Sequence, residues 1–177
     1  FFDAPQLDPE VKAAVLTAID VLKDAGAIVT ETEIPHAAES KDANMLIMVG
    51  EAFAYHRPDL GSMYDTYGRY TAEVLARGAL FGASDYVQAQ RFRSYFCKEV
   101  ARVMADFDVL ITPTMISPAP LRSEMSPSKM IDNPSYTGTW NLTGLPAMAI
   151  PCGFSANTLP LSMQIIGKPF AEETVFK

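Results

Sequence analysis

The sequence predicts an α/β domain in which a mixed β-sheet is flanked by helices. A helix with one apolar stripe runs directly into an alternating, strand-like segment near the start of the chain, which is half of an α/β unit. Two apolar runs near the end are joined by a turn-rich link of about ten residues, which suits an antiparallel pair or a hairpin. The composition is globular, with 49% hydrophobic and 20% charged residues, and 177 residues are enough for one domain with its own core.

The first predicted element is the helix that follows Asp8. Asp8 is a good N-cap, Pro9 stands at the first helical position and Gly26 follows the last turn. Residues 28–34 then alternate between apolar and polar side chains, which predicts a half-exposed strand that Pro35 ends.

The middle of the chain predicts three further helices. Residues 45–55 are apolar nearly all round, so we expect a buried helix that ends before Pro58. A further helix is predicted in the second half of residues 62–82. The longest pattern covers 84–108, where Ser84 is the expected cap. One apolar stripe of that helix is formed by Ala89, Phe92, Phe96, Val100, Val103 and Phe107.

The last third predicts strands around a long loop. A short strand at 109–112 is followed by residues 113–135, which hold five Pro and five Ser without periodicity and therefore predict a loop. Strands are expected at 147–150 and 161–166, and 171–177 resembles the first turn of a helix.

Charge and cysteine content exclude several classes of function. A net charge of −7 and a pI of about 4.8 argue against nucleic acid as a direct partner and against an anionic membrane surface. No apolar run is long enough to span a membrane, and no secretory leader is visible. Two cysteines are too few for a disulfide framework, so a reducing, cytoplasmic setting is expected. The opening "FFDAPQLDPE", without Met, suggests that something upstream is absent.

The residues alone indicate no complete active site. His36 and His56 are isolated from other ligands at metal-binding spacing, and neither a Gly-rich phosphate loop nor a G-x-S-x-G motif occurs, so neither a metal nor a cofactor is expected. Cys152 has apolar flanks and no His nearby in sequence. We therefore expect a buried, unreactive thiol there, and expect Cys97 to serve packing.

A resemblance to a known family is carried by the C-terminal third of the chain. Residues 141–146 (NLTGLP), 151–154 (PCGF) and 159–170 (LPLSMQIIGKPF) form one long ordered string. This string resembles the C-terminal part of the amidase signature family. The segments "LDPEVKAAV", "ASDYVQAQRFR" and "FDVLITPTM" resemble earlier landmarks, so the resemblance covers nearly all of 1–177, as the C-terminal portion of an amidase domain.

The resemblance implies hydrolysis or transfer of amide groups. Family members use a Ser nucleophile, a second Ser in a cis peptide and a Lys, and no stretch here matches that apparatus. The catalytic residues are therefore expected in an upstream half of the same protein, which would be a partner of this chain, and this chain alone is expected to be inactive. The implied function is hydrolysis of a small-molecule carboxamide through a Ser acyl-enzyme. The alternatives are the A subunit of a tRNA-dependent amidotransferase and a non-catalytic binding or scaffold module. The upstream genomic sequence would separate an enzyme from the binding module, and neighbouring genes for other amidotransferase subunits would separate the two enzymes.

Four residues are candidates for substrate binding by this resemblance. Tyr136, Trp140 and Asn141 precede the strand at 147–150, and Arg77 resembles an Arg that shapes the substrate end in some members. A structural role is the alternative for each: Asn141 as a turn residue, Trp140 as core, and Arg77 as a solvated helix charge, the favoured explanation there.

Loss of an upstream half would also expose a sheet edge and apolar helix faces. The isolated chain is therefore expected to form a homo-oligomer or to aggregate. The candidate surfaces are Ala147–Ile150 and the stripe Phe92–Phe96–Val100–Val103.

Overall fold

A computed structural model describes residues 1–125 and 136–177. The helices of these residues are α1 (Pro9–Asp24), α2 (Ala37–Met63), α3 (Arg69–Arg77), α4 (Ala83–Met104), α6 (Thr137–Thr143) and α7 (Glu172–Val175). The strands are β1 (Val109–Pro113), β2 (Ala147–Phe154) and β3 (Pro160–Gly167), and short 3₁₀ turns are η1 (Tyr64–Thr66), η2 (Gly78–Leu80) and η3 (Arg122–Glu124). Among the described residues, no helix is long and apolar enough to cross a membrane.

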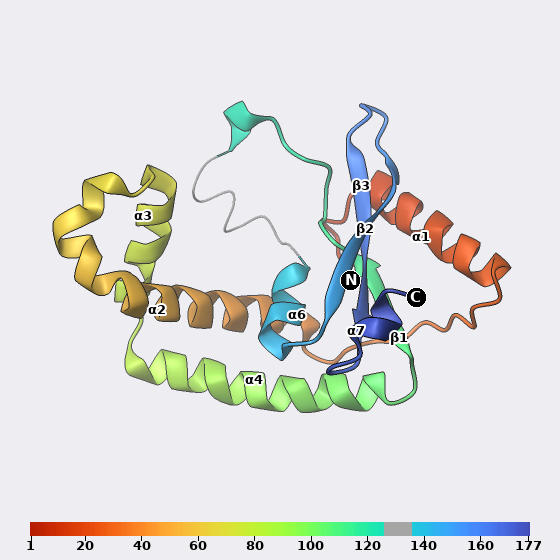
Figure 1. The fold of residues 1–177 in the computed structure, drawn as a ribbon, viewed down its shortest axis with the longest axis horizontal. Coiled ribbons are helices and arrows are strands. Elements are labelled where there is room, and N and C mark those ends of the chain that lie inside the picture. Colours follow the sequence, from red (N-terminus) through yellow and green to blue (C-terminus); the bar gives the residue numbers. More distant parts are fainter. Residues whose placement is uncertain (126–135) are drawn as a thin grey trace.

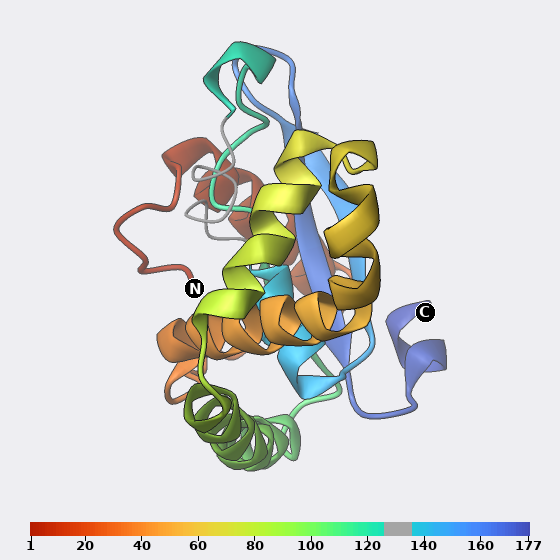
Figure 2. The same ribbon diagram turned by 90° about the vertical axis from the view of Figure 1, so that its left-hand side faces the viewer.

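The three strands form one sheet in the order β1-β3-β2, with β3 in the centre. Both pairings are antiparallel, which confirms the expected pairing of the last two strands. Helices pack on both faces, so the α/β class is also confirmed: α1 lies on one side of the sheet, and α2, α4 and α6 lie on the other (Figure 1). Figure 2, seen from the α3 side, shows α2 and α3 in front of the sheet.

Each face of the sheet has its own core because side chains alternate along a strand. On the α1 side, Val11 and Val15 pack against Leu161 and Met163 of β3. On the other side, the buried residues are Ala43, Ile47, Ala89, Phe96, Val100, Met104, Leu110, Trp140, Leu142 and Ile166. Burial on both faces fixes the register of β3, since a slip of one residue would exchange the two cores.

The strand expected at 28–34 does not form. These residues belong to no helix or strand, and they cross from α1 to α2 as an irregular trace (Figure 1). Ile28 is 96% exposed, so the alternating pattern buries no complete face. Alternation favours an extended chain, but a strand also needs a hydrogen-bonded neighbour, and the three described strands pair only with one another.

Two helix boundaries differ from the prediction. α2 continues through Pro58 to Met63, because the loss of one intrahelical bond is offset where α3 and η2 pack along this helix. The cap of α4 is Gly82 and not Ser84: the Asp85 carboxylate accepts the Gly82 N–H at 2.8 Å, and the helix begins at Ala83.

The apolar stripe of α4 is not the exposed surface that we expected. Phe96 is 0% exposed and Val100 is 1% exposed, because α2 and α6 of this same chain cover them. In contrast, Ala147 and Ala149 of β2 are exposed on an edge strand. The long loop predicted at 113–135 is described over 114–125, which contain the short turn η3; residues 126–135 lie outside the described residues.

Candidate functional site

Buried polar side chains gather where β1 ends. Gln164, on the central strand, is 2% exposed and stands directly opposite Thr112 in the pairing of β1 with β3. The Gln164 Nε2 donates to Thr112 Oγ1 at 2.9 Å and to the Pro113 carbonyl at 3.2 Å. A side-chain amide thus binds the last two residues of β1 from the middle of the sheet.

The chain leaves β1 at Thr114, which links the sheet to the start of α6. Its N–H donates to the Ser162 carbonyl at 3.2 Å, and its own carbonyl accepts the Tyr136 N–H at 3.1 Å. The Thr114 hydroxyl is buried without a hydrogen-bond partner. β3, the exit of β1 and Tyr136 are therefore connected in series by hydrogen bonds.

Tyr136 is buried at the entrance to α6. Its hydroxyl donates to the Phe1 carbonyl at 3.1 Å, and its ring meets the Phe1 ring edge-on with the centroids 5.0 Å apart. Burial raises the pKa of the Tyr136 phenol. The group is therefore a neutral hydrogen-bonding phenol at neutral pH, suited to binding and orienting rather than to proton abstraction.

Trp140 and Asn141 are adjacent on α6 but lie in different surroundings. Trp140 is 1% exposed, stacks on Phe1 at 5.6 Å between centroids, and belongs to the core shared with α4. Its Nε1 has no hydrogen-bond partner. Asn141 is exposed. Of the two, Asn141 is available to a ligand as the structure stands, whereas Trp140 has the surroundings of a core residue.

Arg77 is not brought to the other three candidates. It is the last residue of α3, and the turn that follows packs against Val49 and Phe53 in the middle of α2. α6 instead contacts the beginning of α2, where the Ser40 hydroxyl meets that of Thr139. Figure 1 shows α3 and α6 at opposite ends of α2.

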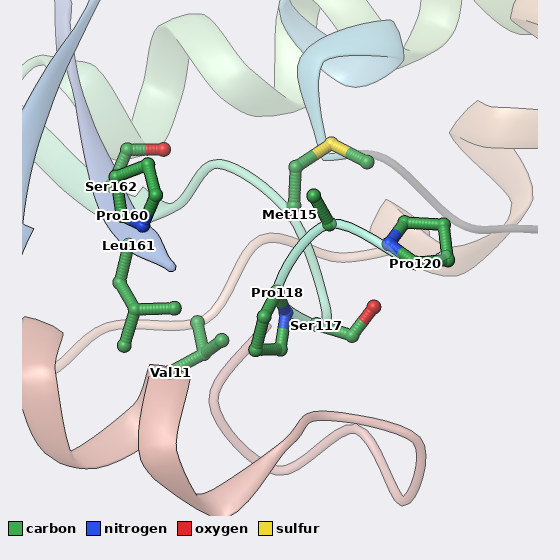
Figure 3. A pocket seen from close by; sticks show the side chains of 9 residues that line it. Val11, Met115, Ser117, Pro118, Pro120, Pro160, Leu161 and Ser162 are labelled. Carbon is green, nitrogen blue, oxygen red and sulfur yellow. The ribbon is translucent and has the colours of Figure 1, made fainter. Parts of the chain in front are cut away.

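A hollow of about 290 Å³ opens beside this region on the α1 side of the sheet. Its lining is mostly apolar and comprises Val11, Met115, Ser117, Pro118, Ala119, Pro120, Pro160, Leu161 and Ser162. Val11 and Leu161 approach each other from α1 and β3, and Pro118 faces them (Figure 3). A mostly apolar surface of this kind suits an apolar group.

The groups named above are hydrogen-bond donors and acceptors, and no acid–base pair occurs among them. Among the described residues, no cluster of three His, Cys, Asp or Glu side chains could hold a metal ion. Cys152, where we expected a buried thiol, is half-buried, and burial raises the pKa of its thiol. Both cysteines are free.

Thr112, Thr114 and Gln164 were not among the site residues predicted from the sequence. The available signal was the presence of polar residues inside two otherwise apolar strand windows, "VLITPT" and "LSMQIIG". A polar side chain in a central strand is buried and needs a hydrogen-bond partner, so it indicates a buried network of hydrogen bonds.

Comparison with known proteins identifies the family. The chain belongs to the Amidase family, whose model matches residues 1–176. It is 37% identical over 185 aligned residues to an amidase of Pseudomonas putida, with 100% of this chain and 39% of that protein covered. It is 32% identical to the A subunit of the glutamyl-tRNA(Gln) amidotransferase of Lactobacillus gasseri, with 97% of this chain and 41% of that protein covered.

Solved structures share the fold. An amidase crystal structure superposes with a TM-score of 0.84 at 22% identity, covering 98% of this chain and 41% of that one. The A subunit of the glutamyl-tRNA(Gln) amidotransferase of Thermotoga maritima gives 0.78 at 28% identity, covering 97% of this chain and 38% of that one. The chain thus spans about two fifths of the length of the curated relatives it matches.

Proposed function

We propose that this chain is the C-terminal portion of an amidase that hydrolyses a small-molecule carboxamide. The observation that carries the proposal is the match to the Amidase family over residues 1–176, together with 37% identity to the Pseudomonas putida amidase across the whole chain. The buried amide, hydroxyl and phenol groups at the exit of β1 support a binding role for this portion. The proposed setting is the cytoplasm, without a metal or cofactor.

The proposed chemistry is acyl transfer through a Ser nucleophile. The Ser oxygen adds to the amide carbonyl, the C–N bond breaks as the amine leaves with a proton, and water then hydrolyses the ester to the acid. The Ser, the second Ser and the Lys are proposed to lie in the three fifths of the relatives' length that this chain does not span. In this proposal the present chain supplies part of the substrate-binding wall, with Tyr136 and Asn141 as candidate contacts.

A second candidate function is the A subunit of a tRNA-dependent amidotransferase. It is favoured by the 32% identity to the Lactobacillus gasseri protein over 97% of this chain. In that case the partners would be further subunits, one of which carries the tRNA. A non-catalytic binding module is a third candidate, which requires that no catalytic Ser and Lys accompany this chain.

The test is expression of the full reading frame that contains this chain. The complete protein is incubated with aliphatic and aromatic amides and ammonia release is followed, with the 177-residue chain as the control. We expect turnover by the complete protein, sensitivity to a Ser-directed inhibitor, and no turnover by the control. Transfer of ammonia to a glutamyl-tRNA only when partner subunits are added would favour the second candidate. Absence of both reactions would favour the third.

A further inference from the structure

Gln164 occupies an unusual position for a polar side chain. It lies in the central strand between Thr112 of β1 and Ala149 of β2, on the face covered by α2, α4 and α6. Ala149 has no polar side chain to offer. The Gln164 amide accordingly turns toward β1, where its Nε2 donates two hydrogen bonds.

The Pro113 carbonyl is the second acceptor of this amide. Pro113 has no N–H, so residue 113 cannot donate to the ladder with β3. The Gln164 side chain, 51 positions away in sequence, instead binds the Pro113 carbonyl at 3.2 Å, and the ladder resumes at the Thr114 N–H. The Thr112 hydroxyl, which accepts from Gln164, donates to the same carbonyl at 3.1 Å, so the two linked side chains fix the direction in which the chain leaves the sheet.

Two parts of the candidate site depend on that direction. The Thr114 carbonyl receives the Tyr136 N–H and so holds the start of α6. The next residue, Met115, begins the wall of the hollow. A shift at Pro113 would therefore move Tyr136 and the wall of the hollow together.

We propose that Gln164 is a positioning residue of the amide site. The inference rests on the proposed function: Gln164 contacts no reacting atom, but its amide sets the exit of β1 and thereby the place of the substrate-binding wall. Binding depends on this placement more than the bond-breaking step does, because the catalytic Ser and Lys are proposed to lie outside this chain. Loss of the amide should therefore raise KM and leave kcat little changed.

The experiment compares variants of the complete protein, assayed well below their unfolding temperatures. Gln164→Met keeps the length of the side chain and removes the donor. We expect KM for a cleaved amide to rise about tenfold to a hundredfold, the effect of a small misplacement of binding groups, with kcat within a few-fold of the wild type. The control is Ser155→Ala, which removes a side-chain hydrogen bond to the Leu159 N–H (3.1 Å) in the β2–β3 turn. It should lower the unfolding temperature and leave KM unchanged.

Gln164→Glu adds a pH readout. A buried carboxyl is neutral at low pH and then retains one O–H donor, which is lost when the group ionises. The kcat/KM of Gln164→Glu relative to the wild type should therefore rise as the pH falls, while the ratio for Gln164→Met stays flat. This pH dependence would not follow from loss of volume or stability alone.

Three results would overturn the inference. The first is a KM of Gln164→Met equal to that of the wild type. The second is a rise in the KM of Ser155→Ala as large as that of Gln164→Met. The third is a kcat/KM of Gln164→Glu, relative to the wild type, that does not change with pH. If the wild type itself cleaves none of the amides, the proposed function fails and the inference falls with it. An active wild type with an unaffected Gln164→Met enzyme overturns the positioning role only.

Discussion

Ser40 and Thr139 are 99 positions apart in the sequence, and their hydroxyl oxygens lie 2.8 Å apart in the core. The Ser40 hydroxyl donates its single proton to the Ala37 carbonyl at 2.7 Å, so the Thr139 hydroxyl is the donor between the two. Both residues are buried, at 0% and 3% exposure. This contact ties the first turn of α2 to α6, the helix that follows the candidate residue Tyr136.

Replacing only one of these hydroxyls should destabilise the protein. Ser40→Ala leaves the buried Thr139 hydroxyl without this partner, at an expected loss of about 1–3 kcal/mol in the free energy of unfolding. The double variant Ser40→Ala/Thr139→Val removes both polar groups and should lose less than the sum of the two single changes. Urea unfolding of the complete protein measures the free energy of unfolding of the two single variants and of the double variant. Strictly additive losses would show that the hydroxyls do not interact.

Gly78 should not tolerate a side chain. A Cβ at this position would lie 2.2 Å from the Val49 carbonyl oxygen and 2.4 Å from the Phe53 Cβ, where η2 crosses α2. We expect Gly78→Ala to destabilise the protein by about 1–3 kcal/mol, because backbone atoms must move. The matched control is Gly61→Ala, near the end of α2, where nothing lies within 4 Å. That change should stabilise by about 0.5–1 kcal/mol. Thermal unfolding shows whether each change lowers or raises the stability. A change of the same direction in both variants would contradict the close approach of η2 to α2.

Cys152 should react slowly with alkylating reagents at neutral pH. Burial raises the pKa of its thiol, so the reactive thiolate is scarce at pH 7 and becomes abundant only in more alkaline solution. The rate of iodoacetamide labelling, followed by peptide mass spectrometry, should climb steadily as the pH rises above 7. Labelling in denaturant gives the rate of the unprotected thiol. Rapid labelling of the native protein that does not change with pH would refute this prediction.

The 177-residue chain by itself should associate. Among the described strands, β2 has a neighbour on one side only, and Ala147, Ala149 and Phe154 are exposed along it. An open edge of this kind pairs readily with another strand. Light scattering over a dilution series should show a dimer or larger species. Ala149→Lys places a charge on the edge strand and should reduce the extent of association. A monomer near 19.3 kDa at all concentrations would contradict the prediction.

Local chemistry in the sequence determined most of the individual elements. Asp8 and Pro9 begin α1 as predicted, with the Asp8 carboxylate accepting the Glu10 N–H at 2.7 Å. The apolar runs at 109–112, 147–150 and 161–166 all became strands. These features depend on capping groups and on the apolar pattern within a few residues, which a sequence displays directly. The family resemblance, carried by an ordered string of residues, was likewise available from the sequence and is confirmed.

Only the tertiary structure decided which of these features had partners. The alternating segment at 28–34 remained irregular whereas the apolar run at 161–166 became β3, because pairing depends on strands remote in the sequence. Packing along α2 decided that the helix passes Pro58, and burial placed Trp140 in the core. The contacts of Gln164 with residues 51 and 52 positions away were likewise absent from any local pattern. Side chains this far apart in sequence meet only when the sheet has assembled, so their roles follow from the fold.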